Sequence, residues 1–276
     1  METNHLNTKD IQKNKNNSHS NVQAIDLPEG KNIYFASDFH LGVPTHEESR
    51  KRENRIVSWL DSIKGDAFKI YLVGDIFDFW FEYKRAIPKG FTRFLGKIAE
   101  LTDSGIEIEF FTGNHDMWMF DYLEKELGVK IHKQEIELLV NSTSIFIAHG
   151  DGLGPGDYSY KFIKKVFSSK VCQWLFARLH PNFGIGLANF FSKSSRKHSI
   201  NDNKFLGEDK EWLITFCKEK LKQKHVDYFI FGHRHHPIEV KLNDSSTYIN
   251  LGEWISHNTY SKFNGKTISI NTFTVS

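Results

Sequence analysis

Aspartate, asparagine and histidine residues of this chain gather in short clusters, each directly after an apolar stretch. These residue types supply the carboxylate, amide and imidazole ligands that divalent transition metals accept together. An Asp-x-His pair places two such ligands on one turn. In chain order the clusters are Asp38-x-His40, Gly74-Asp75, Gly113-Asn114-His115-Asp116, His149-Gly150-Asp151 and Gly232-His233-x-His235.

The apolar stretches before these clusters are too short for helices and rich in β-branched and aromatic residues, which predicts buried strands. They cover Ile33–Ser37, Lys69–Val73, Ile106–Thr112, Ile145–Ala148 and Val226–Phe231. Ligands of open α/β sheets bind beyond the carboxyl ends of the strands. We therefore expect the five clusters to meet at one edge of a sheet and to form a metal site there.

Asp75 is the best candidate for a carboxylate shared between two metal ions. Two ions about 3.5–4 Å apart clamp an attacking hydroxide and a phosphoryl oxygen. Taken singly, each ligand has an ordinary alternative: Asp38 caps a turn, His40 packs in the core, and His235 with His236 lies on the surface. The repetition of ligand types after five separate strands favours the metal site over five unrelated coincidences.

Length and composition describe an ordinary globular chain. Its 276 residues can bury a sizeable core, and a formal net charge of +2 gives no argument for a polyanionic partner. The two cysteines, Cys172 and Cys217, form neither a C-x-x-C pair nor a disulfide framework, which fits a reducing cytoplasm. With no N-terminal apolar segment and no run of about eighteen apolar residues, we expect no signal peptide and no spanning helix.

Residues 1–30 are polar and rich in asparagine and lysine, so we expect a mobile tail followed by a folded domain over residues 31–276. Apolar residues at helical spacing, together with capping residues at Thr45–Glu48, predict helices that face the core. The predicted helices cover about 45–65, 91–103, 120–127 and 208–222. The predicted hairpins cover about 135–148, 238–251 and 260–275, which suggests a second sheet packed on the first.

A basic and apolar insertion from about 152 to 204 stands apart from this pattern. Residues 158–200 contain eight Lys or Arg and no Asp or Glu, and their apolar residues recur at four-residue steps until Pro181, Gly184 and Gly186 break the helix. One interpretation is a helical hairpin whose apolar face attaches it to the core. The other is a lid for an amphipathic substrate, with acyl chains on the apolar wall and phosphates on the basic side chains.

The five clusters, in this order over residues 33–252, resemble the motif set of the calcineurin-like metallophosphoesterases. The resemblance implies an α/β fold: a four-layer αββα sandwich of two mixed β-sheets flanked by helices, here with a helical cap insertion. It implies one divalent ion on Asp38, His40, Asp75 and His235, and a second on Asp75, Asn114, His149 and His233. His115 would stabilise the phosphate or protonate the leaving group, and Asp78 would orient Asp75.

Within that family, the chain is more closely similar to the diphosphatases of the lipid A pathway. The similarity rests on the insertion and on the segments Gly74–Trp80, His149–Tyr160 and Leu251–Trp254. It implies two ions, manganese in that family, and cleavage of UDP-2,3-diacylglucosamine to UMP and 2,3-diacylglucosamine 1-phosphate. The similarity also implies a location at the cytoplasmic face of the inner membrane, with peripheral attachment to it. The substrate contacts that it implies are Asp157, Tyr160 and Arg196.

The sequence leaves alternatives to this activity to be weighed. The best-known lipid A diphosphatases carry arginine where this chain has His115, so another phosphoesterase activity, on a protein, a nucleotide or a nucleic acid, competes. A nuclease would require a basic groove with exposed stacking aromatics, whereas the aromatics here alternate with aliphatic residues, so we expect no nucleic-acid partner. A non-catalytic scaffold on the same fold is expected to have lost ligands, and here each position is filled. The oligomeric state stays open.

Overall fold

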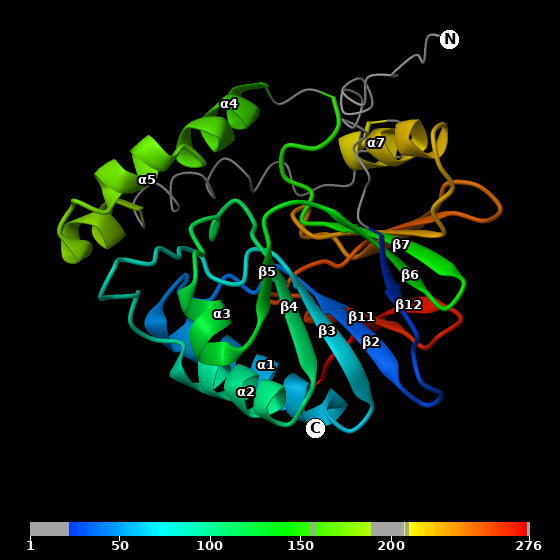
Figure 1. The fold of residues 1–276 in the computed structure, drawn as a ribbon, viewed down its shortest axis with the longest axis horizontal. Helices are drawn as coiled ribbons and strands as arrows, with labels where there is room; N and C mark the ends of the chain where they lie inside the picture. The colour runs from blue at the N-terminus through cyan, green and yellow to red at the C-terminus, as the bar shows by residue number, and fades with distance from the viewer. Residues whose placement is uncertain (1–21, 156–157, 189–206, 208–209, 275–276) are drawn as a thin grey trace, which may run out of the picture.

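Two six-stranded sheets packed face to face form the centre of the computed structural model, which describes residues 22–155, 158–188, 207 and 210–274 (Figure 1). The first, called the β3 sheet, consists in spatial order of β12 (Ile268–Thr272), β11 (Thr259–Phe263), β2 (Asn32–Ala36), β3 (Ala67–Val73), β4 (Glu107–Phe111) and β5 (Lys130–His132). The second, called the β7 sheet, consists of β1 (Val22–Ile25), β6 (Ile136–Val140), β7 (Thr143–Ala148), β8 (Tyr228–Phe231), β10 (Thr247–Asn250) and β9 (Ile238–Lys241).

Parallel strands lie at the centre of both sheets. β2, β3, β4 and β5 pair in parallel, and so do β7, β8 and β10. Antiparallel hairpins complete the sheets, namely β6–β7, β9–β10 and β11–β12, all three as predicted. Every residue of β2 is buried, which is typical of a parallel strand covered on both faces.

Helices cover the outer face of each sheet and give the predicted four layers (Figure 1). The β3 sheet is covered by α1 (His46–Ile63), α2 (Thr92–Asp103) and α3 (Tyr122–Leu127), and the β7 sheet by α7 (Trp212–Leu221). The capping residues work as expected, because Thr45 Oγ1 accepts a hydrogen bond from Glu48 N at 3.2 Å.

Each interface between layers has its own apolar core. Trp59, Phe94 and Leu123 pack on the outer face of the β3 sheet, whereas Ile214 and Cys217 pack on the outer face of the β7 sheet. The core between the sheets includes Phe35, Tyr71, Ile147, Ile230 and Ile249. The predicted α/β sandwich is therefore confirmed.

The chain enters the fold earlier than predicted. Residues 1–21 of the expected tail lie outside the described residues, but Val22–Ile25 forms β1, which pairs in parallel with β6. Leu27 is buried, and its N–H donates to Asn141 Oδ1 at 3.0 Å. The prediction of a tail through residue 30 is thus wrong for 22–27, because this segment pairs along the edge of the β7 sheet and buries Leu27.

The insertion is helical over the residues that the structure describes. It contains α4 (Tyr158–Phe167), α5 (Lys170–Phe176) and a helical stretch over 181–188. The predicted helix breaks earlier than expected, at Ser169, whose side chain caps α5 by accepting from Val171 N. Pro181 begins a helical stretch instead of ending one, since proline fits the first turn of a helix. The predicted remainder, 189–204, lies outside the described residues.

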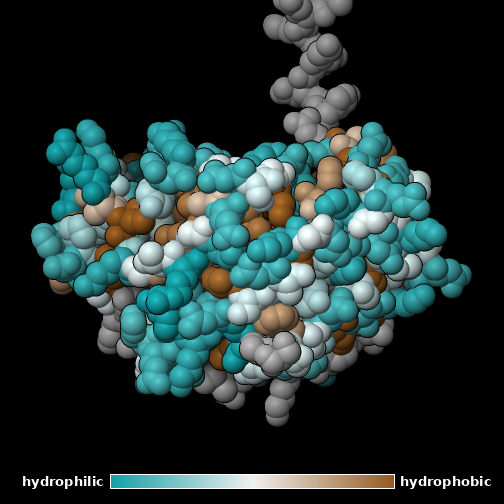
Figure 2. Space-filling model, turned by 90° about the horizontal axis from the view of Figure 1, so that it is seen from below, coloured by the Kyte–Doolittle hydropathy of each residue, from teal (hydrophilic) through white to brown (hydrophobic). Residues whose placement is uncertain are grey.

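The apolar side chains of the insertion are largely exposed. Exposed fractions reach 68% for Phe162, 66% for Val171 and 56% for Trp174, so these residues do not attach the helices to the core. Attachment instead involves Phe176, the last residue of α5, whose ring contacts Phe81. Helices α4 and α5 lie away from the outer helix layers (Figure 1). Seen from below, most of the molecule is hydrophilic, with hydrophobic side chains showing in small groups (Figure 2).

Candidate metal centre

The five ligand clusters follow β2, β3, β4, β7 and β8, and the structure brings them together beyond the carboxyl ends of these strands. Among the residues that the structure describes, three groups of side chains have possible metal-ligand atoms within 4.8 Å of one another. The groups are Asp38 with His40, Asp75 and His235; Asp75 with His149 and His233; and His40 with Asp78 and His115. Asp75 belongs to two of them, which is the position expected of a bridging carboxylate.

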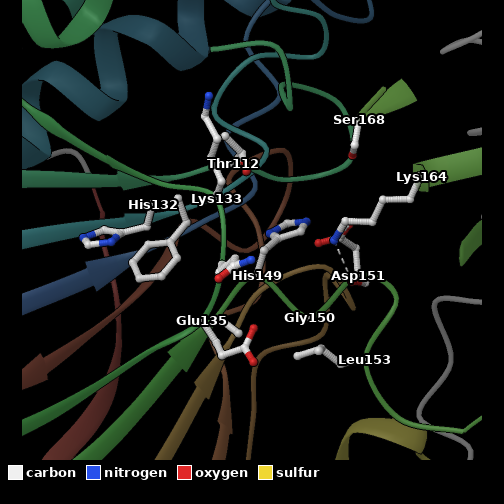
Figure 3. A pocket seen from close by; sticks show the side chains of 13 residues that line it. Thr112, His132, Lys133, Glu135, His149, Gly150, Asp151, Leu153, Lys164 and Ser168 are labelled. Carbon is white, nitrogen blue, oxygen red and sulfur yellow. Dashed lines mark hydrogen bonds and ion pairs between the residues drawn. The ribbon is translucent and has the colours of Figure 1, made fainter. Parts of the chain in front are cut away.

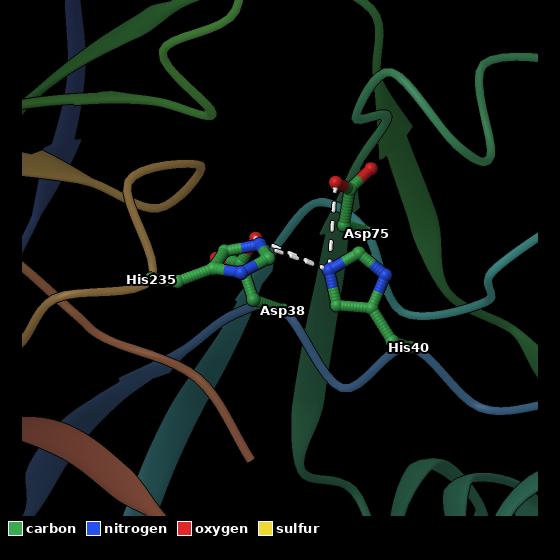
Figure 4. A group of neighbouring side chains, drawn as sticks. All are labelled: Asp38, His40, Asp75 and His235. Atoms are coloured by element: carbon green, nitrogen blue, oxygen red, sulfur yellow. Dashed lines mark hydrogen bonds and ion pairs between the residues drawn. The ribbon is translucent and has the colours of Figure 1, made fainter. Parts of the chain in front are cut away.

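Imidazole nitrogens and carboxylate oxygens converge in the first group (Figure 4). His40 Nε2 lies 3.0 Å from His235 Nε2 and 3.8 Å from both Asp38 Oδ1 and Asp75 Oδ2. His235 Nε2 lies 3.1 Å from Asp38 Oδ1. Such a mixture of nitrogen and oxygen ligands around one point is compatible with a divalent transition metal.

The second group is held by backbone contacts behind it. His149 Nδ1 lies 2.8 Å from Val73 O, and a proton on Nδ1 donated there leaves Nε2 as the ligand atom. His149 Nε2 is 3.4 Å from Asp75 Oδ2 and 3.4 Å from Asn114 Oδ1. The ring of His233 lies 5.2 Å from that of His149, centroid to centroid.

Backbone strain is concentrated at this centre. Among the described residues, eight other than glycine have a positive φ, and five of these are candidate ligands. The five are Asp38 at 55°, His40 at 43°, Asp75 at 53°, His233 at 66° and His235 at 53°. Such left-handed backbone is costly for these residue types and persists where the surrounding structure imposes it, often at functional sites.

Two glycines allow the loops to approach one another. A Cβ atom at Gly113 would overlap the carboxylate of Asp75, and one at Gly232 would lie 2.5 Å from Asp38 Oδ2. Each glycine thus makes room for a candidate ligand from a different segment. The glycine before Asn114 and the glycine before His233 have this direct steric reason.

Charges at the centre favour the binding of cations. Burial raises the pKa of Asp38 and Asp75, but the nearby imidazoles lower both values further, so both carboxylates stay ionised at neutral pH. Burial lowers the pKa of His149, but the charge of Asp75 outweighs it and raises this pKa to about 10, so without a metal the ring is protonated and an ion that binds there would displace the proton from Nε2. Burial lowers the pKa of His233 to about 4, so its neutral ring can offer a lone pair. The residues present therefore fit divalent ions.

Two residues that support the candidate ligands were not predicted from the sequence, and the first is Asp116. Asp116 Oδ2 accepts from Ile76 N at 2.8 Å and from Phe77 N, while its Oδ1 accepts from Gly113 N, so Asp116 joins the loops that carry Asp75 and Asn114. Its place in the Asn114 cluster was the available signal.

Arg234 is the second supporting residue. It is buried between the two histidines of its cluster, pairs with Glu211 through Nε at 3.1 Å and Nη2 at 2.9 Å, and lies 4.4 Å over the Trp212 ring. This pairing ties the cluster to the start of α7. A basic residue between two ligands was its only sequence signal.

The remaining predicted residues are placed as follows. Asp78, for which the sequence predicts a role in orienting Asp75, has its Oδ1 3.6 Å from His40 Nδ1 and 3.8 Å from His115 Nδ1, so it lies beside two imidazoles. His115 N donates to Asp75 Oδ1 at 2.9 Å, and its Nδ1 lies 3.0 Å from Asp78 O. Tyr160 O–H donates to Asp151 Oδ2 at 2.6 Å. Asp157 and Arg196 lie outside the described residues.

An apolar cavity of about 700 Å³ opens beside the centre. Asp78, Asn114 and His115 line its inner end. The rest of its wall is apolar except for Tyr160 and Lys164, and it comes partly from the core and partly from the insertion, including Trp118, Phe162, Ile163, Phe167, Phe176 and Leu187. A group bound at the metal centre is therefore next to a space suited to hydrocarbon.

The family model for calcineurin-like phosphoesterases matches residues 31–237, and the chain belongs to this family. Among its relatives, the UDP-2,3-diacylglucosamine hydrolase of Porphyromonas gingivalis (strain ATCC BAA-308 / W83) is 40% identical over 254 residues, or 86% of this chain and 95% of that protein. The protein of the same name from Histophilus somni (strain 2336) is 26% identical over 230 residues, or 81% of this chain and 92% of that protein. A solved structure of Entamoeba histolytica Vps29 with zinc has a TM-score of 0.40 and 11% identity, covering 87% of this chain and 89% of that one.

Proposed function

We propose that this chain hydrolyses the pyrophosphate bond of UDP-2,3-diacylglucosamine and releases UMP and 2,3-diacylglucosamine 1-phosphate. The observation that carries the proposal is the apolar cavity beside Asn114 and His115, because this substrate joins a cleavable phosphate to acyl chains. The names of the relatives support the same substrate. A phosphoesterase for water-soluble substrates has no need of a hydrocarbon-sized space at its reaction centre.

In this proposal the ligand sets are those that the sequence predicted: Asp38, His40, Asp75 and His235 for one ion, and Asp75, Asn114, His149 and His233 for the other. Two divalent ions, for which we propose Mn²⁺, would supply Lewis-acid activation of water and would neutralise phosphoryl oxygens. The protein holds the carboxylates ionised and fixes the ring of His149 through Val73 O.

His115 is proposed to contact the substrate phosphate. Its ring lines the inner end of the apolar cavity and is fixed by the contact of Nδ1 with Asp78 O. Burial lowers its pKa to about 4, so in the absence of substrate the ring is neutral at pH 7. It would therefore act by hydrogen bonding to the phosphoryl group. A phosphate leaving group departs readily as an anion, so the reaction does not require His115 as a strong acid.

The exposed surface of α4 and α5 supports attachment to a membrane surface. Apolar Phe162, Val171 and Trp174 are exposed there beside basic Lys165 and Lys170. None of the helices in the described part of the chain is both long and apolar enough to cross a bilayer. We propose peripheral binding to the cytoplasmic face of the inner membrane, with about 1 kcal/mol from each basic residue near an anionic surface. Co-sedimentation with anionic vesicles that persists at high salt would contradict this electrostatic attachment.

The deciding experiment measures UMP release from UDP-2,3-diacylglucosamine and from UDP-glucosamine, with and without Mn²⁺. We expect Mn²⁺-dependent hydrolysis of the lipid only, abolished by Asp75→Asn and retained by Asp61→Asn, a change at an exposed aspartate of α1. Equal cleavage of simple phosphodiesters and the lipid would favour another phosphoesterase activity. A purified protein that binds no metal ion under any condition would favour the scaffold.

A further inference from the structure

A second cavity, of about 300 Å³, adjoins the metal centre and is polar (Figure 3). It lies between the ends of β4, β5 and β7 and is lined by His149, whereas the apolar cavity is lined by Asn114. His149 Nε2 and Asn114 Oδ1 are 3.4 Å apart, so the two cavities meet at the centre. Lys164 lines both. One elongated molecule can therefore occupy both cavities with its phosphates between them.

The lining of the polar cavity offers hydrogen-bonding groups of several kinds. Gln134 supplies an amide, Glu135 a carboxylate, and Thr112 and Ser168 hydroxyl groups. In Figure 3 the side chain of Lys164 extends to Asp151 on one side of the cavity, Glu135 lies on another side, and the His132 ring points away. His132 is also paired with Glu109, so it has a structural role.

These groups match the nucleoside end of a nucleotide. A carboxylate is a common partner for ribose hydroxyls. An amide both donates and accepts, as the edge of a uracil ring requires. Lys164, whose Nζ lies 2.6 Å from Asp151 Oδ2, adds positive charge next to the place where the phosphate would lie. The volume is at the low end of the roughly 300–1,000 Å³ found for small-molecule sites, which favours a pyrimidine over a purine.

We propose that this polar cavity is the uridine subsite, with Gln134 and Glu135 as residues that recognise the nucleoside. The proposal rests on the proposed function and extends it, because it assigns the two ends of one substrate to two cavities. The acyl-glucosamine end lies among the insertion helices, and the uridine end lies against the connection between β5 and β6.

The test uses the full chain and UMP as the probe, because UMP binding can be measured by calorimetry without turnover. We expect Gln134→Ala and Glu135→Gln each to weaken UMP binding by about tenfold, the effect of losing one or two hydrogen bonds. Hydrolysis of bis(p-nitrophenyl) phosphate, which has no nucleoside, should fall by less than UMP binding in both variants. Ser168→Trp should fill the cavity and abolish UMP binding. Gln23→Ala on β1 and Glu239→Gln on β9 are matched controls that should bind UMP like the wild type.

The outcomes separate this proposal from the proposed function. If the wild type cleaves the lipid but Gln134→Ala and Glu135→Gln bind UMP normally, the uridine subsite is refuted and the function stands. If the variants weaken UMP binding but no lipid is cleaved, the subsite stands and the function fails. Binding of glucosamine 1-phosphate that is tighter than that of UMP, and that is lost in the same variants, would assign the cavity to the sugar and overturn the proposal. AMP binding as tight as UMP binding would overturn the preference for a pyrimidine.

Discussion

Gly113 lies where the loop after β4 passes over the carboxylate of Asp75, and a side chain there has no room. We expect Gly113→Ala to displace Asp75 and to reduce bound metal and activity by about 100-fold or more. Changing a residue that only holds a metal ligand in place already lowers metal affinity or activity 10–100-fold. Gly96→Ala is the matched control. Gly96 is exposed within α2 with nothing near its Cβ position, so alanine should raise the free energy of unfolding by about 1 kcal/mol. Metal analysis and denaturant unfolding check both; an active Gly113→Ala would contradict the tight approach.

A change of the His115 side chain should distinguish metal binding from contact with the phosphate, because the ring and the backbone N–H have different partners. Its ring lines the apolar cavity, and its backbone N–H, which a side-chain change retains, holds Asp75. We therefore expect His115→Ala to lower turnover by about 100-fold or more, the usual effect of losing one donor to the transition state. Bound metal, measured by elemental analysis, should stay within twofold. A parallel loss of metal and turnover would show that His115 serves the metal site instead.

The ionisation of Glu109 should make the stability of the fold depend on pH. Burial raises its pKa, but hydrogen bonds from His132 and Lys69 lower it further, to about 2. The lowered value means that this carboxylate stabilises the fold above its unfolded pKa and loses that effect as the pH falls toward about 2. In unfolding titrations from about pH 5 to pH 3, the wild type should lose more stability than Glu109→Gln. Glu126→Gln, an exposed change on α3, should behave like the wild type, and equal slopes in all three proteins would contradict the prediction.

The candidate ligands could be found in the sequence because each combines ligand chemistry with a position after a predicted strand. The supporting residues could not. Asp116 acts through backbone N–H groups of two other loops, and Arg234 through a glutamate 23 residues away, so only the folded structure reveals their partners. The contact of Asp78 with His40 could not be predicted for the same reason, since their distance depends on how two loops turn.

Among the helices and strands, α5 is attached to the rest of the fold mainly by its last residue, Phe176. Phe176 contacts the rings of Phe79, Phe81 and Trp118, at 6.0, 4.7 and 4.7 Å between centroids, whereas neighbouring Leu175 is 53% exposed. We expect Phe176→Ala to release α5 and to speed tryptic cleavage after Arg178 several-fold. Leu175→Ala, the matched control, should leave the cleavage rate unchanged. Equal rates in the two variants would indicate that other contacts hold α5.

Elements with strong periodicity or end signals were predictable, and those ordered by neighbours were not. Thr45 marked the start of α1, and buried apolar runs marked β2 and β3. β1 depends on pairing with β6, which its own composition does not encode. The break between α4 and α5 depends on the cap formed by Ser169, and because serine also occurs within helices, the residue alone did not mark the break.

At the scale of the whole molecule, metal binding should stabilise the fold. The ligands come from five separate segments in strained conformations, so ions that bind the folded state alone shift the equilibrium toward it. We expect saturating Mn²⁺ to raise the melting temperature by about 5 °C or more relative to the chelator-treated protein. The shift should disappear in Asp75→Asn and persist in Asp61→Asn. An unchanged melting temperature in the wild type would contradict a preformed site.

The route of the chain also sets when the centre can exist during synthesis. His40 and His235 face each other across 195 residues of sequence, and β2 pairs with β11, which is close to the C-terminus. Contacts between such distant segments form slowly, because the chain loses the entropy of closing a long loop before the contacts that offset this loss are made. A chain still on the ribosome holds only part of the ligand set until the segment after β8, with His233 and His235, has emerged. Both proposed ligand sets are therefore completed by the same segment, the one that carries His233 and His235.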